Sequence, residues 1–171
     1  KDGDEDYPAL MLASHLLGGG GSSRLWQRLR EREGLSYDVY ATVGWSLYER
    51  HSWWVGGAIF APANRAKVEA AFKEEIARAL KDGFSAKELA EGKRALLNAR
   101  RLGRAQDANL AAAWARYLEL GRSFAYSAQV DARIAALTVE QVNAALRKYL
   151  DPSRLVLGVA TADIARLFLV P

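Results

Sequence analysis

Two kinds of hydrophobic periodicity divide the chain. Between residues 37 and 48, apolar positions alternate with more polar ones, beginning with Tyr37 on the apolar side. This alternation predicts a strand with one buried face. Residues 53–60 are apolar and include two adjacent glycines, which inside a strand indicate a bulge or a close backbone approach. Residues 49–51 suit a turn, so we expect the two strands to pair as an antiparallel hairpin.

A helical period replaces this alternation in the second half of the chain. Residues 64–80 have an apolar stripe along one helical face, with Asn64 as the expected capping residue. Two capping boxes, beginning at Ser85 and at Thr138, mark the starts of later helices. The sequence therefore predicts helices over residues 64–80, 85–102, 107–120, 124–136 and 138–150.

The remaining predicted elements are a helix over residues 9–17, which follows Pro8, and an apolar strand over residues 154–161. Strands thus gather at both ends of a helical middle and do not alternate with helices. This order indicates an α+β fold, with an antiparallel sheet packed against several helices. We expect a single domain over residues 1–161, followed by a tail, residues 162–171, without a recognisable pattern.

The stretch 16–40 joins these elements into a compact unit. It contains four consecutive glycines, Gly18 to Gly21, and then two serines, either of which can cap the short helix that follows. Gly34 suits the position just past the end of that helix. Because glycine has no Cβ, we predict that Gly19 or Gly20 has a positive φ or touches neighbouring backbone.

The residues of this unit resemble a motif of one enzyme family. The glycine run continues as Ser22-Ser23-Arg24-Leu25, and the chain later reads Leu29-Arg30-Glu31 and Gly34-Leu35-Ser36-Tyr37. The combination is similar to the second, non-zinc-binding domain of insulinase-like (pitrilysin-type, inverzincin) zinc metallopeptidases, over roughly residues 8–161. That domain carries further strand sequence before its first helix. The resemblance therefore implies that this chain starts inside the domain, with at least one strand missing.

The resemblance also implies a function that two domains share. A partner of similar fold, on the same polypeptide or on a second subunit, would carry the His-x-x-Glu-His motif and bind zinc, and this chain would bind no metal. Arg30 and Tyr37 match the family's catalytic arginine and tyrosine, which contact the backbone of an unfolded peptide substrate and steady the oxyanion at the scissile carbonyl. Gly18 to Gly21 and Ser22 are the expected substrate-binding residues.

The residue types alone leave other assignments open. Without the resemblance, Arg30 reads as a surface arginine and Tyr37 as a half-buried strand tyrosine. His15 and His51 have no carboxylate at helical spacing, so they predict no zinc site within this chain. Ser22 lies outside any nucleophile elbow, and the glycine run lacks the lysine of a phosphate-binding loop. A packed or capping role is therefore favoured for His15, a cap or loop role for Ser22, and a close backbone approach or a flexible joint for the glycine run.

Composition bounds the class of protein. The chain has 171 residues, no cysteine and a formal net charge of +4. No long apolar run occurs, so the sequence predicts no membrane span. Because cysteine is absent, a reducing and an oxidising compartment fit equally, and both the cytoplasm and the periplasm of a bacterial cell stay open for a soluble protein.

Two other functions remain as alternatives. One is a basic nucleic-acid-binding module. The basic residues are spread over helices among acidic ones, and this pattern favours a solvated surface and no nucleic-acid partner. A catalytically silent structural relative, like the core subunits of respiratory complexes, is the other alternative. Arg30 and Tyr37 together favour the peptidase half over the silent relative.

Overall fold

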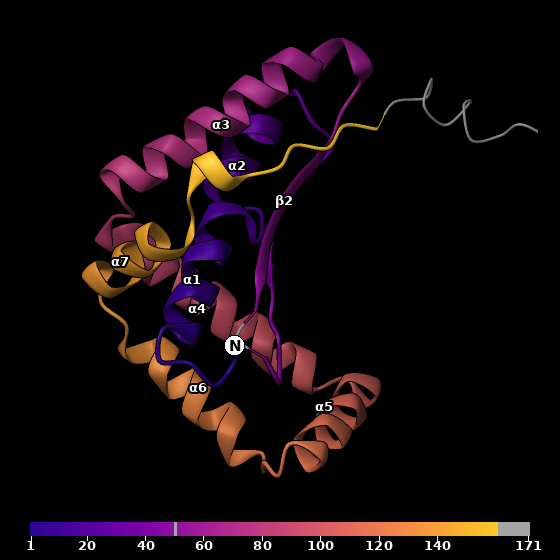
Figure 1. Cartoon of the computed structure of the whole chain (residues 1–171), viewed down its shortest axis with the longest axis vertical. Coiled ribbons are helices and arrows are strands. Elements are labelled where there is room, and N and C mark those ends of the chain that lie inside the picture. Colours follow the sequence, from indigo (N-terminus) through magenta and orange to yellow (C-terminus); the bar gives the residue numbers. More distant parts are fainter. Residues whose placement is uncertain (50, 161–171) are drawn as a thin grey trace, which may run out of the picture.

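The computed structural model describes residues 1–49 and 51–160, and these residues form an α+β fold as predicted (Figure 1). The helices are α1 (Tyr7–Gly18), α2 (Arg24–Trp26), α3 (Arg65–Asp82), α4 (Ala86–Arg104), α5 (Asp107–Glu119), α6 (Ala125–Ala136) and α7 (Val139–Tyr149). A π-helix, η1 (Gln27–Arg32), extends α2, and short 3-10 helices occupy Pro62–Asn64 and Pro152–Arg154. Over the described ranges, no helix has the length and apolarity that crossing a membrane requires.

Helix α1 occupies the centre of the molecule. It packs against strand β1 (Asp38–Gly44) on one side and against α4, α6 and α7 on others (Figure 1). Leu12 and Leu17 of α1 are completely buried, as are Leu29 of η1 and Ile134 of α6. One hydrophobic core therefore joins residues from both ends of the described chain.

The two strands form the predicted antiparallel hairpin. β1 pairs with β2 (Trp53–Ile59) from Asp38 opposite Ile59 to Gly44 opposite Trp53. The alternation is confirmed from Val39 to Val43, because Val39, Ala41 and Val43 are buried. β1 ends at Gly44, so the strand predicted to continue to residue 48 is shorter than expected. Tyr37 departs from it, since it precedes β1 and its side chain is 76% exposed.

The capping residues were predicted with mixed success. Ser85 and Thr138 make the predicted capping boxes at the starts of α4 and α7. Ser23 lies at the N-cap position of α2, but its hydroxyl donates to the Gly20 carbonyl 2.6 Å away and accepts no capping bond. The Asn64 side chain likewise makes no cap and donates to the Leu35 carbonyl. The backbone positions were right, but both side chains donate to carbonyls outside the helices that they precede.

The predicted strand over residues 154–161 is wrong for the residues that the structure describes. Pro152–Arg154 is a 3-10 helix, and residues 155–160 are extended without pairing to β1 or β2. The Val156 side chain is 97% exposed. An apolar run becomes a strand only when a neighbouring strand satisfies its backbone groups, and here none does so within the described ranges. The predicted tail, 162–171, lies outside the described residues.

The end of α1 contacts β1 so closely that only glycine fits. A Cβ added to Gly18 would lie 2.5 Å from the backbone nitrogen of Ala41, and one added to Gly19 would lie 2.6 Å from the Cα of His15. Gly19 has φ −89°. The prediction for the glycine run is therefore confirmed by the close contact at Gly19 and by the positive φ of Gly20, +159°.

Helix α2 is attached to the start of α4 by a charged pair. Arg24 donates two hydrogen bonds to the Glu88 carboxylate, of 2.6 and 3.0 Å, and a third of 2.6 Å to the Gly83 carbonyl. Burial raises the pKa of Glu88, but the bonds from Arg24 and Ser85 outweigh burial and lower that pKa from 4.5 to about 2. Glu88 thus stays ionised and holds the glycine-run side of the molecule to α4.

This pair should stabilise the fold at neutral pH and lose its effect in acid. A carboxylate whose pKa is lowered on folding stabilises the folded state above its unfolded pKa, and the contribution is lost as pH falls from about 4.5 towards 2. We expect the melting temperature of Glu88→Gln to lie below that of the parent chain near neutral pH and to approach it in acid. Glu91→Gln, on the exposed part of α4, is the control. A gap independent of pH would contradict this assignment.

Alanine substitutions in the glycine run should separate close contact from mere spacing. Gly18→Ala forces a methyl group into the Ala41 backbone, and overpacking of this kind costs about 1–3 kcal/mol. Gly21→Ala is the matched control, since the atom nearest to its added Cβ is 3.9 Å away, and its effect should stay within about 0.5 kcal/mol. Urea unfolding measures both variants. Equal stabilities would show that the run is only a spacer.

Candidate functional site

The candidate site is the corner formed by η1 and the turn that leads into β1. Leu25 and Leu29 are fully buried and hold one face of this segment in the core. Gly34 ends it with φ +59°, a conformation that glycine adopts readily. The amides of Leu35 and Ser36 then both lie within hydrogen-bonding distance of the Leu29 carbonyl, at 2.8 and 3.2 Å. The chain therefore reverses in a tight, internally bonded turn.

The structure brings Arg30 and Tyr37 together across this turn. The Arg30 guanidinium carbon lies 4.4 Å from the centre of the Trp26 ring and 5.2 Å from that of the Tyr37 ring. Arg30 also donates a hydrogen bond to the backbone carbonyl of Tyr37. Cation–π contacts on two rings and a hydrogen bond restrict the Arg30 side chain although it is 37% exposed.

Tyr37 combines a hydrogen-bonded backbone with a side chain whose ring faces Arg30. Its amide donates to the Ile59 carbonyl at 2.8 Å, and the neighbouring Ser36 hydroxyl lies 2.7 Å from the carbonyl oxygens of Asp38 and Ile59. Among the described residues, none forms a hydrogen bond with the Tyr37 hydroxyl. Chemically, the corner offers a restrained guanidinium beside an exposed phenol O–H, and both groups donate to anionic or carbonyl oxygens.

The glycine run lies on the other side of Trp26, beside β1. Gly18, Gly19 and Gly20 line a groove of about 430 Å³ together with His15 and Trp26. The predicted substrate-binding residues Gly21 and Ser22 are exposed and do not line this groove. Trp26 was missed by the sequence reasoning, although its position four residues before Arg30 on a helix was a signal that the two side chains meet.

His15 has the packed role that the sequence favoured. The side chain is half-buried beside Gly19, and burial lowers the pKa of the imidazole. His51 lies far along the chain and pairs with Glu49 at the exposed end of the hairpin. In residues 1–49 and 51–160, no group of three or more His, Cys, Asp or Glu side chains could hold a metal ion.

Comparison with known proteins identifies a family. The model of the peptidase M16 inactive domain matches residues 1–96 of this chain. A search of curated proteins gave no match. The family match confirms the resemblance first drawn from the glycine run and the Gly-Leu-Ser-Tyr turn.

Solved structures agree with the family match. A peptidase M16 inactive domain from Pseudomonas fluorescens is 30% identical, with a TM-score of 0.70 over 87% of this chain, and the chain spans 35% of its length. A candidate zinc protease from Bordetella pertussis Tohama I, 21% identical, has the same fold, with a TM-score of 0.68 over 88% of this chain and 82% of its own. A protease from Helicobacter pylori is 19% identical, with a TM-score of 0.66 over 86% and 35% of the two chains. The chain belongs to the peptidase M16 family, as an inactive domain of that family.

Proposed function

We propose that this chain is the non-metal-binding half of a zinc metalloendopeptidase and supplies Arg30 and Tyr37 to a cleft shared with a His-x-x-Glu-His domain. One observation carries the proposal. The Arg30 guanidinium is held between the Trp26 and Tyr37 rings, while the Tyr37 hydroxyl remains free at an exposed corner. The guanidinium also donates to the Tyr37 carbonyl, so contacts within the chain order this corner and leave the Tyr37 hydroxyl as the donor available to a ligand.

The chemistry of peptide hydrolysis suits these two groups. Attack of water on a peptide carbonyl produces a tetrahedral oxyanion, and the zinc of the partner domain would activate the water and neutralise part of the charge. The Tyr37 O–H can donate to the oxyanion, provided that it meets the oxyanion better than the ground-state carbonyl. Arg30 offers further donors in a planar fork to carbonyl oxygens of the substrate backbone.

The groove beside β1 supports a substrate-binding role for the glycine run. Gly18 to Gly20 line it, and at Gly20 the backbone of another segment could approach closely, because the nearest atom to an added Cβ is 3.9 Å away. Trp26 borders both the groove and Arg30. We therefore assign Gly18 to Gly20 to the path of an unfolded peptide, and we assign Gly21 and Ser22 to its rim.

Tyr37→Phe tests the oxyanion role directly. In the enzyme assembled from this chain and its zinc-binding partner, loss of one oxyanion donor should lower kcat by about 10²-fold, with zinc content unchanged. Tyr149→Phe, at an exposed tyrosine at the end of α7 and outside the groove, is the matched control and should leave kcat as it was. Steady-state kinetics on a quenched peptide measure both. Full kcat for Tyr37→Phe, with chemistry rate-limiting, would contradict the role.

Arg30→Ala tests substrate binding. Because Arg30 would hold the peptide backbone in the ground state and the transition state alike, its removal should lower kcat/KM mainly through a higher KM. The Tyr37 carbonyl also loses its partner in this variant, so a smaller decrease in kcat should accompany the change. An unchanged kcat/KM would remove Arg30 from the site.

The chain by itself should be inactive. No cluster of metal ligands lies within the residues that the structure describes, so the purified chain should neither hydrolyse unfolded peptides nor hold stoichiometric zinc. Elemental analysis and the same peptide assay measure this. One tightly held zinc per chain, lost when His15 and His51 are replaced, would contradict the assignment of zinc binding to the partner domain.

A further inference from the structure

We infer that Arg28 is a positioning residue for Arg30, because it holds η1 in the wide π-helical turn from which Arg30 reaches Tyr37. The inference rests on the proposed function for its catalytic consequence. Its structural part, that Arg28 maintains the π-helical turn, stands by itself and has its own measurement.

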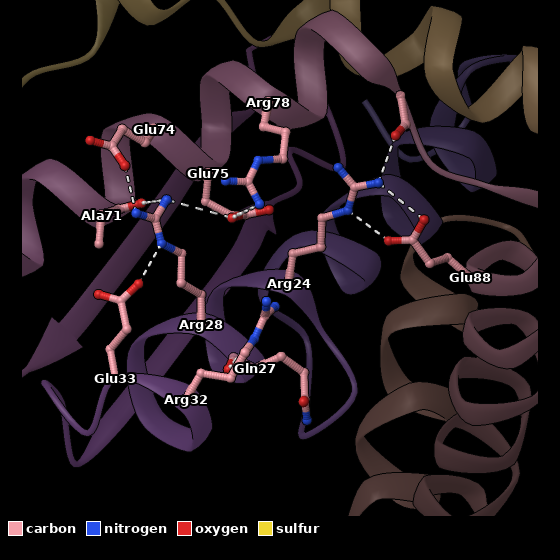
Figure 2. A network of polar contacts seen from close by, with 11 residues as sticks. Arg24, Gln27, Arg28, Arg32, Glu33, Ala71, Glu74, Glu75, Arg78 and Glu88 are labelled. Atoms are coloured by element: carbon pink, nitrogen blue, oxygen red, sulfur yellow. Dashed lines mark hydrogen bonds and ion pairs between the residues drawn. The ribbon is translucent and has the colours of Figure 1, made fainter.

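Arg28 makes more polar contacts than its neighbours in η1 (Figure 2). Its Nε donates to the Glu33 carboxylate at 2.8 Å, and its two terminal nitrogens donate to Glu74 at 2.5 Å and to the Ala71 carbonyl at 3.2 Å. The Glu75 carboxylate lies 3.7 Å away. The Arg28 side chain is only 14% exposed, so it ties η1 to the middle of α3.

The contact between Arg28 and Glu33 selects the π-helical turn. In an α-helix, residues three or four apart lie on the same face, whereas a π-helix closes its backbone bonds between residues five apart. The Glu33 amide donates to the Arg28 carbonyl at 3.0 Å, and the side chains of the same two residues pair. Backbone and side chain thus reinforce the same five-residue spacing.

Two further contacts repeat this spacing. The Trp26 indole donates to Glu31 at 3.0 Å, and the Arg32 Nε donates to the Gln27 carbonyl at 3.2 Å. Both are exposed and both lie within η1 or beside it. Arg28 differs because it alone among these also binds α3, so it connects the turn to the rigid core.

Arg30 is held by residues of this turn. Among the described residues, its hydrogen bond, ion pair and cation–π contacts are with Trp26, Glu31 and Tyr37, all local in sequence. If the segment rewound to an α-helix, the residues after Arg28 would rotate about the helix axis, and the guanidinium would leave the space between the Trp26 and Tyr37 rings. Arg28 would therefore act on substrate only through Arg30.

The buried Glu75 requires a second variant in the test. Its side chain is 2% exposed and lies 3.4 Å from Arg78 as well as beside Arg28. Arg28→Gln removes one of its two cationic neighbours, which can destabilise the fold for reasons unrelated to η1. Glu33→Ala breaks the same five-residue pair from its more exposed end and leaves Glu75 with both arginines.

A double-mutant cycle in the assembled enzyme tests the catalytic part. Arg28→Gln and Glu33→Ala should each lower kcat/KM on a quenched peptide by about tenfold, and the loss should disappear when Arg30→Ala is already present. Arg100→Gln is the matched control, because Arg100 pairs with Asp131 in a similar half-buried setting on α4. Its effect should be small and independent of Arg30.

Hydrogen exchange tests the structural part in the same assembled enzyme. Peptides that contain the Glu33 amide should exchange at least several-fold faster in Arg28→Gln and Glu33→Ala, and at the parent rate in Arg100→Gln. If Arg28→Gln and Glu33→Ala lower kcat/KM by the same factor with and without Arg30, the positioning role is wrong. An unchanged exchange rate for these peptides in Glu33→Ala would also overturn the positioning role, even if Arg28→Gln fails to fold. Normal activity of Arg30→Ala would instead refute the proposed function. The exchange rates alone would then test whether Arg28 maintains the π-helical turn.

Discussion

The structure depends on the burial of most of α1. This helix packs against β1, α4, α6 and α7, and Leu12, Leu16 and Leu17 are among the apolar residues that it buries there. The same helix must end where the strand passes, and only glycine permits that contact at Gly18. The candidate site follows from this constraint, because the chain leaves α1 through the glycine run and returns as η1 and β1.

The elements that could be predicted are those whose signals are local. The alternation over β1 and the capping boxes at Ser85 and Thr138 depend on residues within a few positions of one another. The strand expected after Arg154 failed for the opposite reason. Its apolar composition is suitable, but a strand exists only with a neighbour, and composition does not reveal whether a neighbouring edge is available.

The candidate site, too, could be predicted only where its signals are local in sequence. The Gly-Leu-Ser-Tyr turn located Arg30 and Tyr37, and the structure brings the two side chains together. The π-helical form of η1 was not predicted, since its stabilising pairs lie five residues apart and involve α3, which is distant in sequence. Sequence patterns assume α-helical spacing, so a segment held by five-residue contacts reads as an ordinary short helix.

The charged contacts of Arg28 matter for the orientation of the site more than for the stability of the fold. Replacing a buried ion pair by apolar residues often leaves a protein equally stable, so the pairing of Arg28 with Glu75 is weak evidence for stabilisation. A guanidinium, unlike an apolar side chain, fixes the orientation of the segment that carries it, because its planar donors reach their acceptors in few orientations. Arg28 has four acidic or carbonyl partners, of which three lie on α3 and one, Glu33, lies just past the end of η1. That number of directional partners restricts the rotation of η1 about its own axis, and this rotation determines where the Arg30 guanidinium lies.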